Sequence, residues 1–279
     1  MMPQATFETR SASARRQNIL DYVRDRGGAQ IDELAGRFVT SRMTIHRDLQ
    51  VLSKRGVLRR VHGGVTTPPK AFSEGSISQR SHRAMEAKQA IAAVAAGLVE
   101  EGEIIALDDS TTSRVLAERL TDSASLTVVT NSMGTANLFT SKPNVNLLLL
   151  GGRYNMDFDA FFGTLCEQAA ASLRVNTLFL SVAAIRGMTA YHQEQDIIKA
   201  KQALMNISDR KILLVDSTKF GVITLNRFSD LTEFDVVITD SGLEKDLEDT
   251  LRNAGINLKI AEISTVRASG SSTSPECNP

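Results

Sequence analysis

The chain has 279 residues, equal numbers of basic and acidic side chains (32 each) and only two cysteines. Two cysteines are too few for a disulfide framework or a cysteine-based zinc site, and no apolar run approaches the ~18 residues that span a membrane. We therefore expect a soluble, cytoplasmic protein. The balanced total conceals two opposite ends, because residues 1–70 carry 13 Lys and Arg against 6 Asp and Glu, whereas residues 71–279 carry 19 against 26.

The basic N-terminal part begins with a polar dozen residues that show no apolar periodicity, and we expect them to be disordered. A first helix is predicted over 13–26, where Ile19, Leu20 and Val23 form its apolar face. A second, shorter helical face lies within 31–38. These elements predict the beginning of a small helical domain.

The third predicted helix, 41–56, is the most informative segment of this part. Its Ile45, Leu49 and Leu52 recur at i, i+4 and i+7, so one stripe of the helix is apolar while basic side chains point elsewhere. Ser41 is its predicted N-cap. Only two residues separate this helix from the one before, and helices joined so tightly cross steeply, as in a helix-turn-helix.

A predicted hairpin follows this helix. The segment VLRRVHGGVTTP, residues 57–68, contains two short β-type runs around Gly63 and Gly64, a pair suited to a tight turn. Together the elements predict a winged helix-turn-helix. Short helix pairs also occur in ordinary helical domains, and it is the excess of basic side chains that favours contact with DNA phosphates.

The segment RRQNILDYVRDRGGAQIDELAGRFVTSRMTIHRDLQVLSKRGVLRRVHGG, residues 15–64, resembles the N-terminal module of DeoR-type transcriptional regulators, including the MTI-RDL core and the R-HGG of the wing. His46 stands where that family usually has an arginine. The resemblance implies double-stranded operator DNA as the partner. The predicted DNA-binding residues are Ser41, Arg42, Thr44, His46 and Arg47 in the reading helix, and Arg59, Arg60 and His62 in the wing.

Beyond the wing the composition of the chain changes. We assign the winged domain to 13–67, a linker rich in Pro, Ser and Gly to 68–78, an α/β domain to 79–263 and a disordered Ser-rich tail to 264–279. About 200 residues suffice for one α/β domain of this kind.

Six predicted strands alternate with helical stretches in the α/β domain. Most are continuous apolar runs, which are typical of strands covered on both faces, and the intervals are long enough for crossover helices. The prediction is a Rossmann-like, mostly parallel doubly wound sheet. Its strands are expected near 103–107, 126–130, 145–150, 177–183, 211–216 and 234–239.

Polar motifs follow four of these strands, where the carboxyl ends of a parallel sheet form a ligand crevice. They are 108–112 (DDSTT), 131–132 (NS), 151–152 (GG) and 216–221 (DSTKFG). Hydroxyl and backbone N–H groups at a helix N-terminus form a ready phosphate site. Each motif alone could equally be a helix cap or a turn.

These motifs also resemble the C-terminal sensor domain of the DeoR family, which is related in fold to ribose-5-phosphate isomerase; the resemblance covers about residues 80–240. It implies that Asp108 and Asp216 orient loops. It also implies a phosphorylated sugar as effector. The expected effector-binding residues are Asp109, Ser110, Thr111 and Thr112 in the phosphate loop, with Asn131, Gly151, Gly152 and Lys219 around the sugar.

One departure from the isomerases bears on catalysis. Those enzymes carry a pair of aspartates after the fourth strand, where this chain has only Ser and apolar residues at 181–184. Proton transfer needs a positioned acid or base, so we expect binding without catalysis, and neither cofactor nor metal. His192 lies near two acidic residues, but the spacing fits no standard metal site and favours a solvated loop.

The resulting hypothesis is a repressor of carbohydrate-metabolism genes that leaves operator DNA when a phosphorylated sugar binds. A single winged module buries too little for tight specific binding, so a homodimer or higher homo-oligomer is expected. Two alternatives stay open. One is a sugar-phosphate isomerase-like enzyme with an appended DNA-binding domain, and the other is a sensor for an unphosphorylated ligand or a protein.

Overall fold

The computed structural model describes residues 12–26, 28–54, 57–61, 63–66, 77–122 and 125–263. The chain forms two compact units, Met1–Ser73 and Glu74–Pro279, which are described separately below. The predicted disorder at the N-terminus, most of the predicted linker and the predicted tail lie outside the described residues.

Unit 1 contains three helices and a three-stranded antiparallel sheet, which confirms the predicted winged helix-turn-helix. The helices are α1 (Ala12–Arg26), α2 (Ile31–Arg37) and α3 (Arg42–Lys54), and the strands are β1 (Gly28–Gln30), β2 (Arg59–Val61) and β3 (Gly64–Thr66) in the order β1-β3-β2. The sequence did not predict β1. Gly28 begins this strand, two residues after the end of the first helix.

The core of unit 1 is built from the apolar stripes of its helices. Ile19 of α1, Leu34 of α2 and Ile45 and Leu49 of α3 are completely buried in one cluster. Gly64 permits the close approach of β1 to β3, because a Cβ atom there would lie 2.5 Å from the carbonyl oxygen of Ala29. The inward faces predicted from helical periodicity are thus confirmed.

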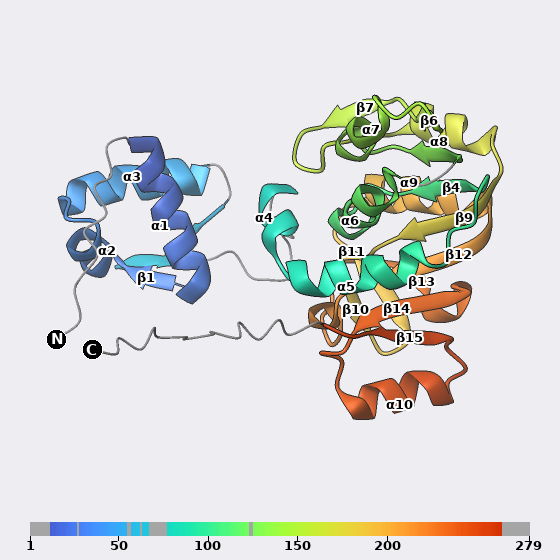
Figure 1. Cartoon of the computed structure of the whole chain (residues 1–279). Helices are drawn as coiled ribbons and strands as arrows, with labels where there is room; N and C mark the ends of the chain where they lie inside the picture. Colours follow the sequence, from blue (N-terminus) through green and yellow to red (C-terminus); the bar gives the residue numbers. More distant parts are fainter. Residues whose placement is uncertain are drawn as a thin grey trace, which may run out of the picture. The chain divides into compact units, whose positions relative to one another are not determined.

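Unit 2 is organised around a seven-stranded sheet in which every pair of neighbouring strands is parallel (Figure 1). Six strands fall within a few residues of the predicted runs. The seventh, β15, is short and was not predicted. In spatial order the strands are β15 (Leu258–Ala261), β14 (Val236–Asp240), β12 (Ser208–Leu214), β9 (Val175–Leu180), β4 (Ile104–Leu107), β5 (Leu126–Thr130) and β6 (Val145–Leu149).

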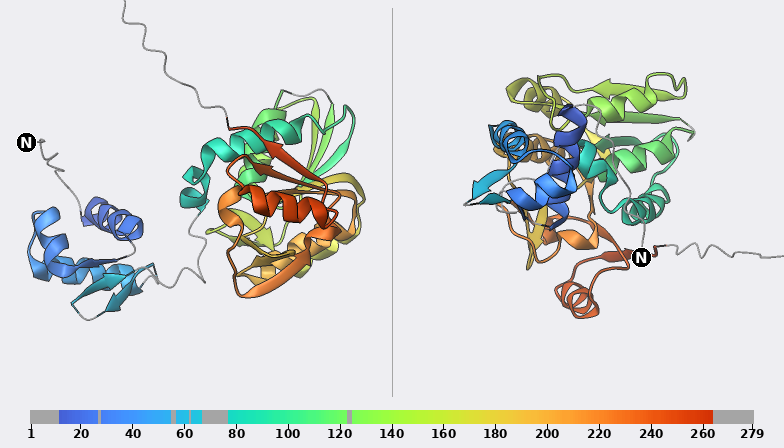
Figure 2. Two further views of the ribbon diagram at one scale, coloured as in Figure 1. Left: turned by 90° about the horizontal axis from the view of Figure 1, so that it is seen from below. Right: turned by 90° about the vertical axis from the view of Figure 1, so that its left-hand side faces the viewer.

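Helices cover both faces of this sheet, as the continuous apolar strands predicted (Figure 2). On β9, Phe179 belongs to a core cluster with α5 (Met85–Ala96), α6 (Thr111–Leu120) and α7 (Met133–Phe139). Its neighbours Leu178 and Leu180 belong to the opposite cluster, with α8 (Thr164–Ala171), α9 (Gln195–Asn206) and α10 (Lys245–Asn253). Successive side chains of a strand point to opposite faces, so the strand is buried on both.

Smaller elements complete unit 2, and most of them were not predicted. Helix α4 (Ile77–His82) is its first described element. Its first two residues were assigned to the linker, so the predicted end of the linker, residue 78, was too late. The others are the hairpin β7 (Arg153–Asn155) and β8 (Ala160–Phe162), the antiparallel sheet of β10 (Ala184–Arg186), β11 (Thr189–His192) and β13 (Asn226–Asp230), and the 3-10 helices η2 (Ser217–Lys219) and η3 (Leu231–Glu233). None of the helices within the described ranges is long and apolar enough to cross a membrane.

Candidate functional site

Helix α3 presents a polar face opposite its buried stripe. Arg42 and Arg47 are exposed, and Thr44 and His46 are half-buried. The predicted N-cap is present, since the Thr44 backbone N–H donates to Ser41 Oγ at 3.2 Å. Ser41 Oγ also bonds Thr44 Oγ1 at 2.9 Å. Ser41 therefore caps the helix, and Arg42 and Arg47 are exposed cations on its polar face.

A hydrogen bond joins the wing to α3. Atom Nη2 of Arg60, on β2, lies 3.0 Å from Nδ1 of His46. A guanidinium can only donate, so Nδ1 accepts and the ring proton resides on Nε2. His46, the residue at which this chain departs from the usual arginine, thus fixes the position of a wing arginine. The side chain of Arg59, and the whole of His62, lie outside the described part of the chain.

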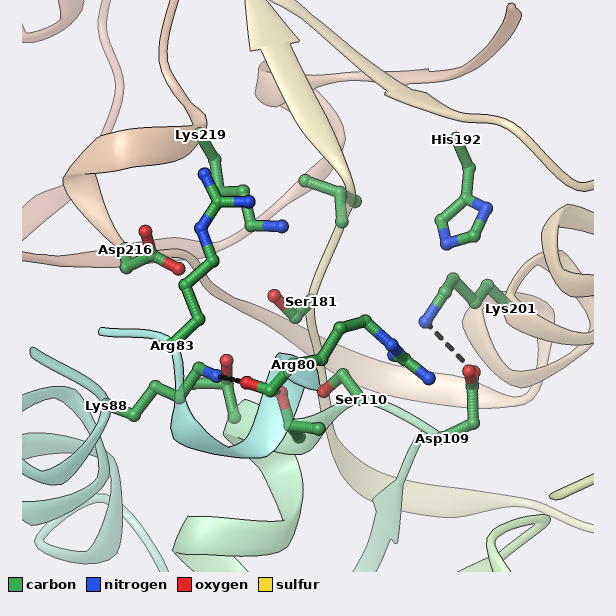
Figure 3. Close-up of a pocket in the computed structure, with 13 residues that line it drawn as sticks. Arg80, Arg83, Lys88, Asp109, Ser110, Ser181, His192, Lys201, Asp216 and Lys219 are labelled. Atoms are coloured by element: carbon green, nitrogen blue, oxygen red, sulfur yellow. Dashed lines mark hydrogen bonds and ion pairs between the residues drawn. The ribbon is translucent and has the colours of Figure 1, made fainter. Parts of the chain in front are cut away.

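A polar pocket in unit 2 opens where the parallel strands β4, β9 and β12 end, which is the predicted edge of the sheet (Figure 3). Seven stretches of the described chain meet there. The lining residues are Arg80, Arg83, Lys88, Asp109, Ser110, Thr111, Thr112, Ser181, Val182, His192, Lys201, Asp216 and Lys219.

The N-terminus of α6 forms the floor of this pocket. Ser110 is the N-cap, and its Oγ accepts from the Ser113 backbone N–H at 3.1 Å. Asp108 supports the turn, because its carboxylate accepts from the backbone N–H of Ser110 at 3.0 Å and of Ser181 at 2.9 Å. The first N–H groups of a helix lack partners within it and carry partial positive charge, so this end of α6 can bind an anion.

A buried ion triad lies at one end of the pocket. Lys201 of α9 bonds Asp108, and it bonds Asp109 at 3.1 Å; all three side chains are almost completely inaccessible. Burial works against the charged forms, but the Lys201 ammonium lowers the pKa of Asp108. Conversely, the two carboxylates overcome burial and raise the pKa of Lys201 to about 12. Both shifts favour the ionised forms of Asp108 and Lys201.

The other end of the pocket is cationic. Lys88, Arg83 and Lys219 lie there together with Asp216, whereas Asp109, the other lining carboxylate of the described residues, lies at the opposite end (Figure 3). The buried Lys88 ammonium donates to the carbonyl of Arg80. Burial lowers the pKa of Lys88 to about 8, with Asp216 opposing this shift and Lys219 adding to it. These side chains, with the N-terminus of α6, can bind a phosphate group.

The structure brings five of the eight predicted effector-binding residues into the pocket: Asp109, Ser110, Thr111, Thr112 and Lys219. Asn131, Gly151 and Gly152 do not line it. Asn131 is buried and donates to the Phe161 carbonyl at 3.0 Å. A Cβ on Gly152 would lie 2.7 Å from the Phe162 carbonyl oxygen, so this glycine permits close packing against β8.

Sequence reasoning missed five lining residues that carry or can carry a charge, four of them cationic: Arg80, Arg83, Lys88, Lys201 and His192. The expectation of a solvated loop at His192 was wrong. The residue lies on β11, is 3% exposed, and its Nδ1 accepts from the backbone N–H of Glu194 at 3.3 Å. Burial alternates along Thr189–His192, but the sequence TAYH shows no matching alternation of apolar and polar residues, and no local signal placed this strand beside α9.

An α/β unit with an anion pocket, carried on the same chain as a winged helix-turn-helix, defines the class of ligand-responsive DNA-binding regulators. Two family models match the chain: the DeoR-like helix-turn-helix domain at residues 15–70 and the DeoR C-terminal sensor domain at residues 83–241. The chain belongs to the DeoR family of transcriptional regulators.

The chain is also similar to several curated relatives and, more distantly, to solved structures. The L-fucose operon activator of Haemophilus influenzae is 35% identical over 232 residues, covering 82% of this chain and 92% of that protein. The lactose phosphotransferase system repressor of Staphylococcus epidermidis is 32% identical over 235 residues, covering 83% and 93%. Ribose 5-phosphate isomerase A from Neisseria gonorrhoeae aligns with 50% of this chain and 54% of its own at 15% identity and a TM-score of 0.34.

Proposed function

We propose that this regulator represses genes of carbohydrate metabolism and leaves its operator DNA when a phosphorylated sugar binds the pocket of unit 2. The observation that carries the proposal is the joint placement of the α6 N-terminus with Lys88, Arg83 and Lys219 at one end of the pocket. A phosphate dianion satisfies the helix N–H groups and the cations together.

The opposite end of the pocket suits the remainder of a sugar. Asp109, Lys201 and His192 offer hydrogen-bonding groups there, and Ser181 adds a hydroxyl. The carbohydrate operons in the names of the two relatives support the sugar class; one of these proteins is named an activator and the other a repressor. Repression by this chain is therefore part of the proposal.

Binding without catalysis is also part of the proposal. Ser181 and Val182 follow β9 where the isomerases carry aspartates, and Asp109 is engaged by Lys201 at 3.1 Å. A catalytic base must be free to reach the substrate proton, and this carboxylate is already bonded to the Lys201 ammonium. An assay for aldose–ketose conversion of sugar phosphates tests this point, with no turnover above the uncatalysed rate as the expected result.

On DNA, we propose that Arg42, Arg47 and His46 of α3 face base edges in the major groove and that Arg60 of β2 contacts the backbone or the minor groove. Two copies of the chain would place two reading helices on the half-sites of one operator. The exposed face of α3 and its bond to the wing support this arrangement.

The experiment measures the release of operator DNA by a panel of sugar phosphates. Fluorescence anisotropy monitors the release, with an operator fragment selected from genomic DNA. Lys219→Ala should still bind the operator and should need about 10- to 100-fold more effector, since a hydrogen bond to a charged group contributes roughly 1.5–3 kcal/mol.

Lys199→Ala is the matched control, because Lys199 is an exposed lysine of α9 that does not line the pocket. Normal release by the Lys219 variant would contradict the placement of the phosphate. Failure of every sugar phosphate to release the wild-type protein would contradict the proposed effector class.

A further inference from the structure

Helix α4 occupies a special place in the chain. It is the first described element after the segment that leaves unit 1. Its Arg80 lies between the two family matches, because the helix-turn-helix match ends at residue 70 and the sensor match begins at residue 83. Arg80 and the following Arg83 nevertheless line the pocket together with residues from the sheet edge. Arg80 thus comes from the segment between the two matched domains, and Arg83 is the first residue of the sensor match.

Arg80 is unusually buried for an arginine. It is 8% exposed, its guanidinium carbon lies 4.6 Å from the centre of the Phe158 ring, and its Nε has no hydrogen-bond partner. Its Nη2 makes one long bond, 3.4 Å, to the carbonyl of Asp157. A buried guanidinium with an unused donor is costly, and an anion in the pocket would satisfy that donor.

The pocket itself holds α4 in place. The Arg80 carbonyl accepts from Lys88 Nζ and, at 3.5 Å, from Thr111 Oγ1, and both partners are lining residues. At its other end, α4 is joined by the Ile77 N–H to the Asp157 carbonyl at 3.0 Å. A helix of six residues is not stable by itself. The position of α4 therefore depends on side chains that a ligand would engage.

The enclosed part of the pocket is small. Its volume is about 30 Å³, room for about two water molecules, and a sugar phosphate is far larger. In Figure 3, Arg83 lies beside the Lys219 end of the pocket, and Arg80 extends toward Asp109 and Lys201. A sugar phosphate in the pocket would therefore extend beyond the enclosed space, where it would contact Arg80 and Arg83.

We propose that Arg80 and Arg83 bind the effector and that α4 is the element through which the occupied pocket acts on the DNA-binding unit. The inference rests on the proposed function of the pocket. A ligand shifts an equilibrium only by binding one arrangement better, and this ligand favours the arrangement of α4 in which Arg80 and Arg83 both contact it. Each displacement of α4 passes directly to the chain segment that leads to unit 1.

The first test is hydrogen–deuterium exchange of the full-length protein with and without inorganic phosphate, at ionic strength matched with sodium chloride. Phosphate should change the exchange rates of the amides of 77–83 by about threefold or more, and should slow exchange at the start of α6. Arg80→Met and Arg83→Gln should each reduce the change in α4. Arg227→Met, an exposed arginine that pairs with Asp230, is the matched control and should behave as wild type.

Unchanged exchange in α4, together with slowed exchange in α6, would overturn this inference and leave the proposed function standing. Unchanged exchange in both helices, with no operator release by any sugar phosphate, would overturn both. Because Arg83 is exposed, Arg83→Gln keeps the test decisive even if Arg80→Met fails to fold.

The second test separates coupling from binding. Insertion of Gly-Ser-Gly-Ser after Ser76 lengthens the connection between α4 and unit 1 without altering a described residue. The variant should bind effector with wild-type affinity, measured by calorimetry with the best sugar phosphate of the panel, but should release operator at least about tenfold less well. Release equal to wild type would overturn the role of α4 in coupling.

Discussion

The two units use positive charge in opposite ways. In unit 1, Arg42, Arg47 and Arg60 are exposed, and the Arg42 side chain is 67% accessible even though it pairs with Asp32. In unit 2, Lys88 and Lys201 are buried and surrounded by fixed partners. Exposed cations suit a long polyanion that must be approached along its surface, whereas buried cations suit a small anion that is enclosed.

The difference has an energetic basis. An exposed arginine keeps its hydration and is screened by salt, so each one contributes little until many phosphates are engaged together. A buried lysine has lost its hydration and depends on neighbouring carboxylates and carbonyls. The two binding surfaces should therefore respond differently to salt, to mutation and to pH.

Salt should separate the two surfaces most strongly. Between 50 and 200 mM salt, operator affinity should fall by about 10³- to 10⁵-fold if the paired reading heads neutralise roughly 6–10 phosphates. Effector affinity should fall by about tenfold or less, because buried charges are screened less. Anisotropy for DNA and calorimetry for effector, in the same buffers, give the two slopes. Parallel slopes would mean that the pocket cations are solvated in solution.

Removal of a buried cation should matter more for folding than removal of an exposed one. Lys201→Met leaves Asp108 and Asp109 buried without their ammonium and should lower the free energy of unfolding by about 3–5 kcal/mol. Arg174→Met breaks an exposed pair with Asp209 and should change it by about 0–1 kcal/mol. Urea unfolding followed by circular dichroism measures both. Equal losses of unfolding free energy in the two variants would contradict the distinction between buried and exposed cations.

Effector binding should weaken above neutral pH, and this is the smallest of the expected effects. Burial lowers the pKa of Lys88 from 10.5 to about 8, with Asp216 opposing and Lys219, Arg80 and Arg83 adding to the shift. A phosphate monoester is already largely doubly charged at pH 7, so the protonated fraction of Lys88 controls the change. That fraction falls from about nine-tenths to one-tenth between pH 7 and 9, and affinity should fall by up to about tenfold.

Lys88→Arg is the control for this pH dependence, because arginine keeps its charge over the whole range. The variant should show a flat profile between pH 7 and 9. If its affinity fell as steeply as that of wild type, a group other than Lys88 would be responsible.

The sequence predicted unit 1 more fully than unit 2. The stripe of Ile45, Leu49 and Leu52 and the cap at Ser41 both follow from local spacing, and the structure contains both. The strands of the large sheet were also predicted, since strands buried on both faces are continuously apolar. The antiparallel sheet that carries His192 was missed, because its strands are only three to five residues long.

The effector pocket shows the limit of local patterns. The loop 108–112 and Lys219 could be predicted because they directly follow strands whose carboxyl ends meet at one edge. Arg80, Lys88 and Lys201 could not, because they lie on helices, and a lysine on a helix is usually at the surface. Asn131 and the two glycines follow strands as well, but they lie outside the pocket.

By itself, therefore, the sequence determined the two classes of unit and the sheet edge at which a ligand would bind, since helix periodicity, strand composition and turn residues act over short stretches of chain. Only the tertiary structure decided which charges meet there. Lys201 and Asp108 are 93 positions apart, and α4 reaches the pocket through contacts to Lys88 and Thr111. A buried charge needs a partner, and the fold can supply that partner from a distant part of the sequence. Local sequence patterns therefore do not predict such pairs.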